Sequence, residues 1–174
     1  MRFNGFSLFR PIDTYLSDLT RFTSVLASNN NLLTPIMRKI NEIIVHCTAT
    51  AEGKDFTVAD IDRWHKAKGW KCIGYHYVVY RDGSVHEGRP VNEVGAHCYG
   101  HNQNSIGVVY IGGCAADGKT PKDTRTQAQK RGLLNLLAKL KKEYRLPKGS
   151  IHGHRDYAAK ACPSFDATKE YAAL

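Results

Sequence analysis

Hydrophobic and polar residues follow two different periods along the chain, and each change of period marks a new element. Ile43–Val45 and Ser105–Ile111 are short apolar runs typical of buried strands. Aromatic and β-branched residues predict another strand over Tyr75–Tyr80. The dipeptide Asp82-Gly83 predicts a tight turn into Val85–Glu87, so these last two segments should form a hairpin.

Apolar residues at three- and four-residue spacings predict helices between the strands. One spans 57–69 and begins with the spacing of a capping box between Thr57 and Asp60. A longer helix is expected over 124–144. Strands separated by helices favour an α/β fold, in which a central mixed β-sheet is flanked by helices. The remaining elements are a short strand and a final helical segment, at residues 151–152 and 165–171.

The first 36 residues differ from the rest. Residues 13–28 place five apolar side chains on one face of a predicted helix, with Asp13 as its N-cap. An exposed apolar stripe of this size would favour aggregation, so we expect it to pack on the back of the domain. Docking of a protein partner is the alternative. The chain thus divides into an N-terminal helical extension, 1–36, and a compact domain, 37–174.

Composition excludes several classes of protein. The chain has 174 residues, of which 42% are hydrophobic and 24% charged, as in one ordinary globular domain. No apolar run approaches the ~20 residues of a membrane span. The N-terminus is broken by charges and a proline before an apolar signal region forms, so we expect no secretory signal. The 5 cysteines cannot all pair, which favours a reducing compartment with free or metal-bound thiols.

The net charge of +9, from 25 Lys and Arg against 16 Asp and Glu, favours an anionic partner. Nucleic acid, acidic lipid and an anionic cell-wall polymer all satisfy that requirement. Eight basic residues and one acidic residue lie between Arg125 and Lys148. We interpret them as the solvated face of the long helix, so we do not expect nucleic acid as a partner.

Two histidines and a cysteine are the strongest candidates for chemistry. His46 ends the first apolar strand, His154 lies in the segment HGHRD, and Cys162 follows eight positions later. Two imidazoles and a thiolate suit Zn²⁺, and three protein ligands leave a fourth position for water, as in catalytic sites. From the residues alone, the alternative is a hydrogen-bonded core histidine and a small buried cysteine.

Five segments, matching in order, make the sequence recognisable. They are IIVHCTAT (43–50), RWHKAKGW (63–70), GYHYVVYRDGSVHEGR (74–89), GAHCYGHNQNSIGV (95–108) and HGHRDYAAKACPSFD (152–166). On these segments, residues 40–171 resemble the zinc-dependent N-acetylmuramoyl-L-alanine amidases of the type 2 family, whose fold T-odd phage lysozymes and peptidoglycan recognition proteins share. The resemblance implies that fold, to which the predicted N-terminal helix is an addition. It also implies an endolysin-like hydrolase cleaving the amide bond between N-acetylmuramic acid and L-alanine.

The resemblance also implies roles for single residues. His46, His154 and Cys162 match the ligands of one zinc ion per chain. Tyr75 matches a tyrosine beside the metal, and Lys160 matches a lysine two residues before the ligand cysteine. Lys160 would stabilise the oxyanion, while Tyr75 would hold the water or donate to the oxyanion. No Glu stands where it would supply a general base, so the base would be Tyr75 or the metal-activated water.

Four further positions lie in matching segments. His97 falls on the wall of the substrate groove near the sugar–peptide junction, so we expect it to bind substrate. His152, Asn104 and Ser105 are expected to be structural, with His152 also able to support the metal ligands indirectly.

Alternation along the strands predicts where other side chains face. Tyr75 should share a face with Tyr77, and Cys47 should point away from His46 into the core. Trp64 and Trp70 fit helix packing better than stacking on a sugar.

Three functions follow, led by the zinc amidase. A non-catalytic peptidoglycan-binding module would lack a ligand, and all three ligands are present. An amidase that also regulates an RNA polymerase is known in the resembled group, but the N-terminus differs here. We expect a monomer without a membrane span, cytoplasmic before release and acting on the bacterial wall, with a possible protein partner at the N-terminal helix.

Overall fold

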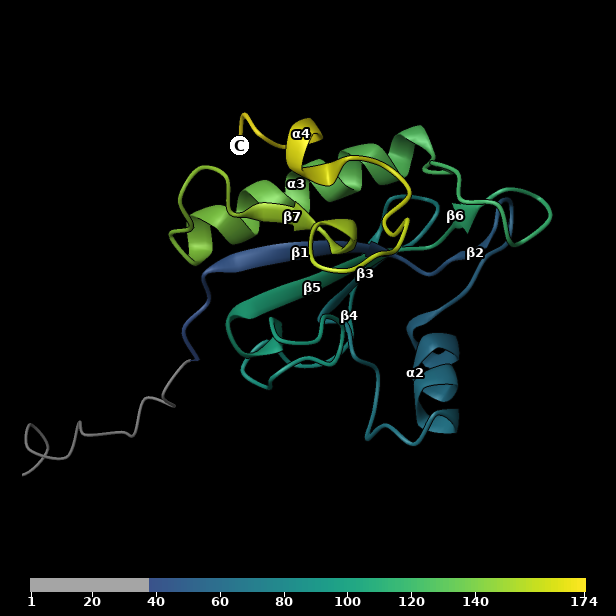
Figure 1. Cartoon of the computed structure of the whole chain (residues 1–174), viewed down its shortest axis with the longest axis horizontal. Coiled ribbons are helices and arrows are strands. Elements are labelled where there is room, and N and C mark those ends of the chain that lie inside the picture. Colours follow the sequence, from purple (N-terminus) through teal and green to yellow (C-terminus); the bar gives the residue numbers. More distant parts are fainter. Residues whose placement is uncertain (1–37) are drawn as a thin grey trace, which may run out of the picture. The chain divides into compact units, whose positions relative to one another are not determined.

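The computed structural model describes residues 38–174 (Figure 1). The predicted N-terminal helix and its packing lie outside the described residues, so they stay predictions. Within 38–174, no helix is long and apolar enough to cross a membrane.

A five-stranded mixed sheet in the order β4-β3-β5-β1-β7 forms the centre of the fold. β1, β5, β7 and β3 run parallel, and β4 pairs antiparallel with β3. The predicted α/β fold and hairpin are therefore confirmed. A separate two-stranded sheet joins β2 (Thr50–Ala51) to β6 (Gly113–Cys114). The main strands are β1 (Glu42–Cys47), β3 (Tyr77–Val79), β4 (Val85–Glu87), β5 (Ser105–Tyr110) and β7 (Ile151–Gly153).

The two longer helices begin with capping boxes. Thr57 caps α2 (Val58–Ala67) together with Asp60, as the sequence predicts. Thr126 caps α3 (Gln127–Glu143), which starts slightly later than expected because Thr126 and Gln129 satisfy the first free N–H groups. The shorter elements are the 3₁₀ turns η2 (Asn102–Asn104) and η3 (His154–Asp156), and the helix α4 (Ala167–Glu170).

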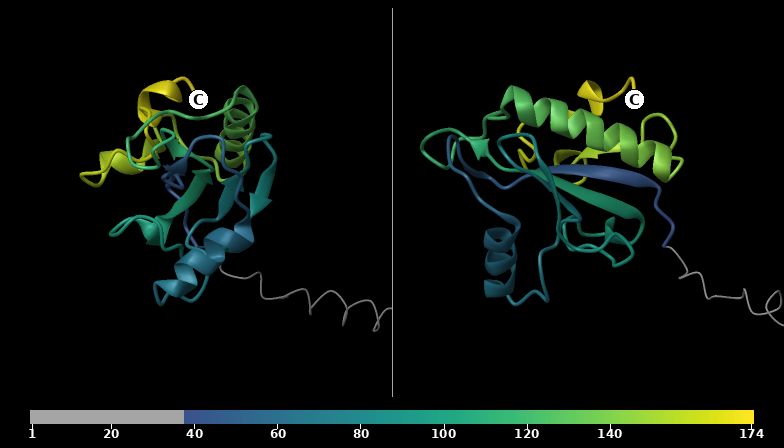
Figure 2. Two further views of the ribbon diagram at one scale, coloured as in Figure 1. Left: turned by 90° about the vertical axis from the view of Figure 1, so that its right-hand side faces the viewer. Right: turned by 180° about the vertical axis from the view of Figure 1, so that it is seen from behind.

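Two hydrophobic clusters cover the two faces of the sheet, and Figure 2 shows α3 on one side and α2 on the other. Leu133, Leu137 and Leu140 of α3 are fully buried in the larger cluster. Ile61 of α2 belongs to the smaller one. With both faces covered, β1 and β5 are buried along nearly their whole length, and polar side chains are accessible mainly at the strand ends.

One basic residue near the long helix does not lie on a solvated face. The side chain of Arg125 is 1% exposed and pairs with Asp123 and Glu170 at 2.8 and 2.7 Å. Its guanidinium carbon also lies 3.2 Å from the centroid of the Phe165 ring. Arg125 therefore joins the start of α3 to α4, which corrects the interpretation of the whole basic run as a solvated face.

Candidate metal centre

The three predicted ligands meet at one end of the sheet. His46 lies near the carboxyl end of β1, and the adjacent parallel strand β7 leads directly into η3, which begins with His154. The loop after η3 returns Cys162 to the same place. One ligand atom from each of these three residues lies within 4.8 Å of the others. The structure thus brings the predicted set together, although their binding of zinc stays a prediction.

The chemistry of these donors fits a zinc ion. Burial lowers the pKa of His46 well below its ordinary value, and the neighbouring His97, His154 and Lys160 lower it further. Burial and Lys160 also lower the pKa of His154. Both rings are therefore neutral at neutral pH and keep a free lone pair. The Cys162 sulfur accepts a hydrogen bond from the Cys47 backbone N–H at 3.3 Å. In the metal-free site the Cys47 thiol and burial raise the pKa of Cys162 above its ordinary value, so its proton would leave when a cation binds.

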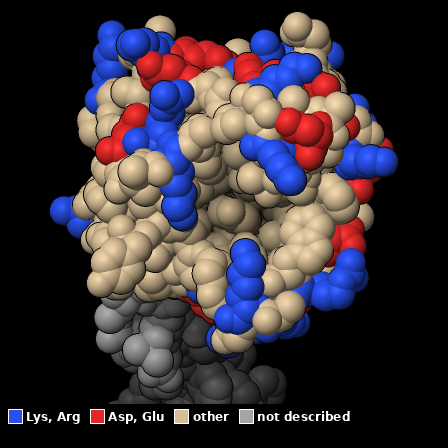
Figure 3. All heavy atoms as spheres, turned by 45° about the vertical axis from the view of Figure 1, so that its right-hand side comes forward, with Lys and Arg blue, Asp and Glu red and all other residues tan. Residues whose placement is uncertain are grey.

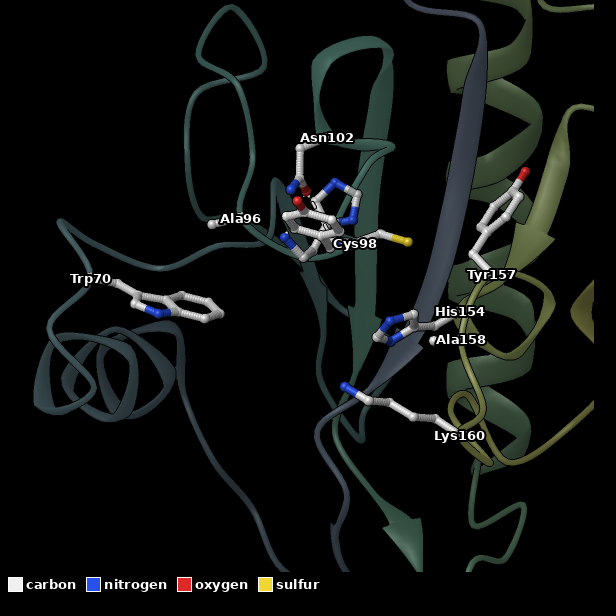
Figure 4. A pocket seen from close by; sticks show the side chains of 10 residues that line it. Trp70, Ala96, Cys98, Asn102, His154, Tyr157, Ala158 and Lys160 are labelled. Carbon is white, nitrogen blue, oxygen red and sulfur yellow. Dashed lines mark hydrogen bonds between the residues drawn. The ribbon is translucent and has the colours of Figure 1, made fainter.

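The two predicted catalytic side chains lie beside these donors. The Tyr75 ring centroid is 5.1 Å from that of His46. Burial raises the pKa of Tyr75 above its ordinary value, and the sulfurs of Cys162 and Cys47 raise it further, so its hydroxyl keeps its proton. Lys160 is exposed, and Figure 4 shows its amine extending into a cavity beside His154. Tyr75 is accordingly a hydrogen-bond donor, and Lys160 a cation facing open space.

The cavity has a volume of about 490 Å³, a size suited to a small part of a larger substrate. Trp70 lies across it from His154 and Lys160 (Figure 4). Figure 3 shows lysine and arginine side chains around a hollow in a largely uncharged face of the molecule. No Asp or Glu lines this cavity among the described residues. Its lining consists of Trp70, Ala96, His97, Cys98, Tyr99, Asn102, His154, Tyr157, Ala158 and Lys160.

Trp70 corrects one expectation. It is 40% exposed on the cavity wall and lies beyond the end of α2. Its ring centroid is 4.5 Å from that of His65, and the two rings are tilted by 43°. The reason is Gly69, whose φ of +84° ends the helical path one residue earlier. The sequence prediction ends the helix at this glycine, so Trp70 already lay beyond the predicted helix.

Tyr75 and Tyr77 do not share a face. Tyr75 packs with the smaller hydrophobic cluster and Tyr77 with the larger one on the opposite side of the sheet. Alternation fails because β3 begins only at Tyr77, so the preceding residues do not follow the strand's pleat. Cys47 is buried in the larger cluster, which confirms that part of the prediction.

His97 lies on the cavity wall as expected, yet it is only 8% exposed. Its Nδ1 atom lies 3.1 Å from Nε2 of His46, so it contacts a candidate metal ligand directly. Its expected contact with substrate stays a prediction. Ser105 is buried and Asn104 bonds to the Lys39 carbonyl, both structural as expected.

A second polar cluster, around Glu42, was not predicted. The Glu42 carboxylate accepts a hydrogen bond from Tyr157 and lies 3.1 Å from Nδ1 of His101. Nε2 of His152 lies 3.9 Å from the same carboxylate, so His152 contacts this cluster. Tyr157 lines the cavity, but no local pattern in the sequence distinguishes it from a packing tyrosine.

Comparison with known proteins finds similarity over most of the chain. A family profile described as "N-acetylmuramoyl-L-alanine amidase" matches residues 37–165. The endolysin of Klebsiella phage KP32 is 43% identical over 129 residues, which cover 74% of this chain and 83% of that protein. The endolysin of Escherichia phage T7 is 43% identical over 125 residues, covering 71% and 80%. The solved N-acetylmuramoyl-L-alanine amidase LysC of Clostridium intestinale aligns with a TM-score of 0.64 and 29% identity, over 76% of this chain and 81% of that one.

Proposed function

This chain belongs to the N-acetylmuramoyl-L-alanine amidase family, and we propose that it works with one zinc ion held by His46, His154 and Cys162. The enzyme hydrolyses the amide bond between N-acetylmuramic acid and L-alanine in peptidoglycan. The observation that carries the zinc proposal is the convergence of two neutral imidazoles and one sulfur within 4.8 Å.

An amide resists hydrolysis because its carbonyl is a poor electrophile and water is a poor nucleophile at neutral pH. A bound zinc ion supplies a Lewis acid that lowers the pKa of a coordinated water to about 7 and polarises a carbonyl. The protein supplies the remaining parts. The Lys160 amine faces the cavity and stabilises negative charge on the carbonyl oxygen.

Tyr75 acts as a hydrogen-bond donor in this proposal. Its hydroxyl keeps its proton because burial raises its pKa, so it orients the attacking water or donates to the oxyanion. Of the two bases that the sequence leaves open, a protonated Tyr75 is the less suitable. Among the described residues that line the cavity, no Asp or Glu offers a carboxylate that could act as the general base.

The substrate is a neutral sugar attached to a charged peptide within an anionic wall. Trp70 and Tyr157 provide aromatic surface in the cavity, and Asn102 provides an amide. The net charge of +9 favours approach to the wall. We propose an endolysin-like monomer that is cytoplasmic until it is released to the wall.

Hydrolysis of a defined muropeptide tests this function. Purified protein with one equivalent of zinc is incubated with a disaccharide–tripeptide, and mass spectrometry identifies the products. We expect two products, a free peptide beginning with L-alanine and an intact disaccharide. Neither product should form after chelation of the zinc, and both should form again when zinc is added back. His154→Ala is the control without a complete ligand set. Binding of the muropeptide without release of peptide, in zinc-loaded protein, would support the non-catalytic binding module instead.

A further inference from the structure

His97 lies directly behind His46, on the side away from Cys162. We propose that His97 is a positioning residue, which fixes the tautomer and orientation of His46 through a chain of hydrogen bonds ending in the backbone. This inference rests on the proposed zinc site and gives His97 a role that differs from substrate binding.

The two nitrogens of His46 face different partners. Nδ1 lies 3.8 Å from the Cys162 sulfur and therefore faces the position of the cation. Nε2 lies 3.1 Å from Nδ1 of His97. A nitrogen that binds a cation carries no hydrogen, so the hydrogen of the neutral His46 ring is on Nε2. His46 Nε2–H therefore donates to His97 Nδ1.

This donation determines the tautomer of His97 in turn. Because its Nδ1 accepts, the hydrogen of the neutral His97 ring is on Nε2, which lies 3.4 Å from Oγ of Ser105. The Ser105 hydroxyl then donates to the carbonyl of His101 at 2.7 Å. Each nitrogen and oxygen in this series of hydrogen bonds is therefore assigned as donor or acceptor. The series ends on a backbone carbonyl oxygen, which can only accept.

The protein leaves room for the His97 ring and holds its backbone. A Cβ atom at Gly95 or Gly107 would come within 2.5 Å of Cδ2 of His97, so side chains there would displace the ring. The backbone N–H groups of His97 and Cys98 both donate to Oδ1 of Asn102, at 2.8 and 2.9 Å. With 8% of its surface exposed, His97 offers a substrate little area, whereas its ring is held against His46 on several sides.

Zinc affinity of the full chain is the direct test, measured by competition with a chromophoric chelator. Loss of such an outer hydrogen-bond partner typically weakens metal binding by about 10–100-fold, and we expect His97→Ala to fall in that range. His97→Gln should recover part of the loss, because its amide oxygen accepts from His46 and its amide nitrogen donates to Ser105. The control is His86→Gln on β4, where the ring stacks on Tyr80 at 3.8 Å, and we expect no change there.

Steady-state kinetics at saturating zinc separate positioning from substrate binding. A positioning role predicts that His97→Ala lowers kcat with little change in KM. Unchanged zinc affinity together with a raised KM would overturn the inference and make His97 a substrate-binding residue. Failure of the wild-type chain to bind zinc would instead overturn the proposed metal site, so the two failures are distinguishable.

The wild-type protein offers a test that needs no variant to fold. Long-range ¹⁵N–¹H spectra of the zinc-loaded chain report which nitrogen of each neutral imidazole carries the hydrogen. We expect the Nε2–H tautomer for both His46 and His97. The Nδ1–H tautomer at His97 would contradict the proposed direction of the chain.

Discussion

Nδ1 of His46 lies 3.8 Å from the sulfur of Cys162, although 116 positions separate the two residues along the chain. His46 lies near the carboxyl end of β1, an inner strand of the sheet, whereas Cys162 is in the loop after η3. A cation held between them would therefore join the loop to the sheet core. Metal binding and folding stability should be coupled in this protein.

Zinc should raise the thermal stability of the chain. At a free zinc concentration about 100 times the dissociation constant, binding to the folded state contributes about 2.7 kcal/mol. For a protein of this size that corresponds to a rise in Tm of roughly 5–10 °C. Calorimetry with zinc and with a chelator measures the shift. An equal shift in Cys162→Ala would show that zinc stabilises the chain from another site.

Replacing Lys160 should impair catalysis without removing the metal. We expect Lys160→Met to lower kcat by about 10²–10³-fold, the usual effect of losing one oxyanion-stabilising group. Zinc content should be unchanged because the amine is not a ligand. Lys169→Met is the matched control, since Lys169 is an exposed lysine paired with Asp166 on the far helix α4. Wild-type kcat in Lys160→Met would rule out the proposed role.

Arg125 should be important for stability and not for chemistry. Arg125→Met would remove a buried guanidinium from Asp123 and Glu170, whose side chains are 30% and 40% exposed, and we expect a loss of about 2 kcal/mol in the free energy of unfolding. Arg131→Met removes an exposed charge from the same helix region, so its effect should stay within about 0.5 kcal/mol. Urea unfolding measures both. Equal effects of the two variants would mean that the buried pairs contribute nothing specific.

Acid should destabilise the metal-free protein through His76. This ring is fully buried, and burial lowers its pKa to about 4, with Arg38 and Arg89 adding to the shift against the opposing Glu93 carbonyl. Its neutral form thus contributes stability that is complete above pH ~6.5 and is lost as the pH falls toward 4.

The loss attributable to His76 between about pH 7 and pH 5 should be roughly 2 kcal/mol, because the unfolded chain gains the proton and the folded chain does not. Urea unfolding in chelator at both pH values measures the slope. His76→Gln should lower stability at both but show a smaller difference between them. If the free energy of unfolding changed equally with pH in wild type and variant, His76 would not contribute to the pH dependence of stability.

A chain shortened to begin at residue 37 should keep zinc binding and amidase activity. The Arg38 guanidinium must be retained, because it bonds to the carbonyl oxygens of Val91, Gln103 and Ser105. We therefore expect a chain that begins at residue 40 to unfold at lower temperature. Activity assays and thermal unfolding of both chains compare the two boundaries. Loss of activity on removing 1–36 would place part of the working site in that extension.

The apolar runs in the sequence were sufficient to predict the strands of the sheet and its hairpin, because such short runs have few alternatives. The residues alone left a core histidine and a buried cysteine open as the alternative to a metal site. The family resemblance singled out His46, His154 and Cys162, which the structure brings together. The face of Tyr75 was predicted wrongly because alternation was extended beyond the first residue of β3. Local periodicity cannot indicate where a strand begins when the preceding residues have the same composition.

The contact between His46 and His97 could not be predicted from either segment. These residues are 51 positions apart on different elements, and their distance depends on how the loop before η2 folds against β5. The bare glycines at 95 and 107 are visible in the sequence. Only the packing shows why glycine stands at both positions: a side chain at either would occupy the space of the His97 ring.

Cobalt(II) titration of the full chain tests the central claim most directly, because cobalt reports both the geometry of a zinc site and the presence of sulfur among its ligands. We predict one equivalent bound, with the visible bands of a tetrahedral site and a sulfur-to-cobalt charge-transfer band that is absent in Cys162→Ser. Failure to bind cobalt, or a charge-transfer band that persists in Cys162→Ser, would contradict a metal centre built from His46, His154 and Cys162.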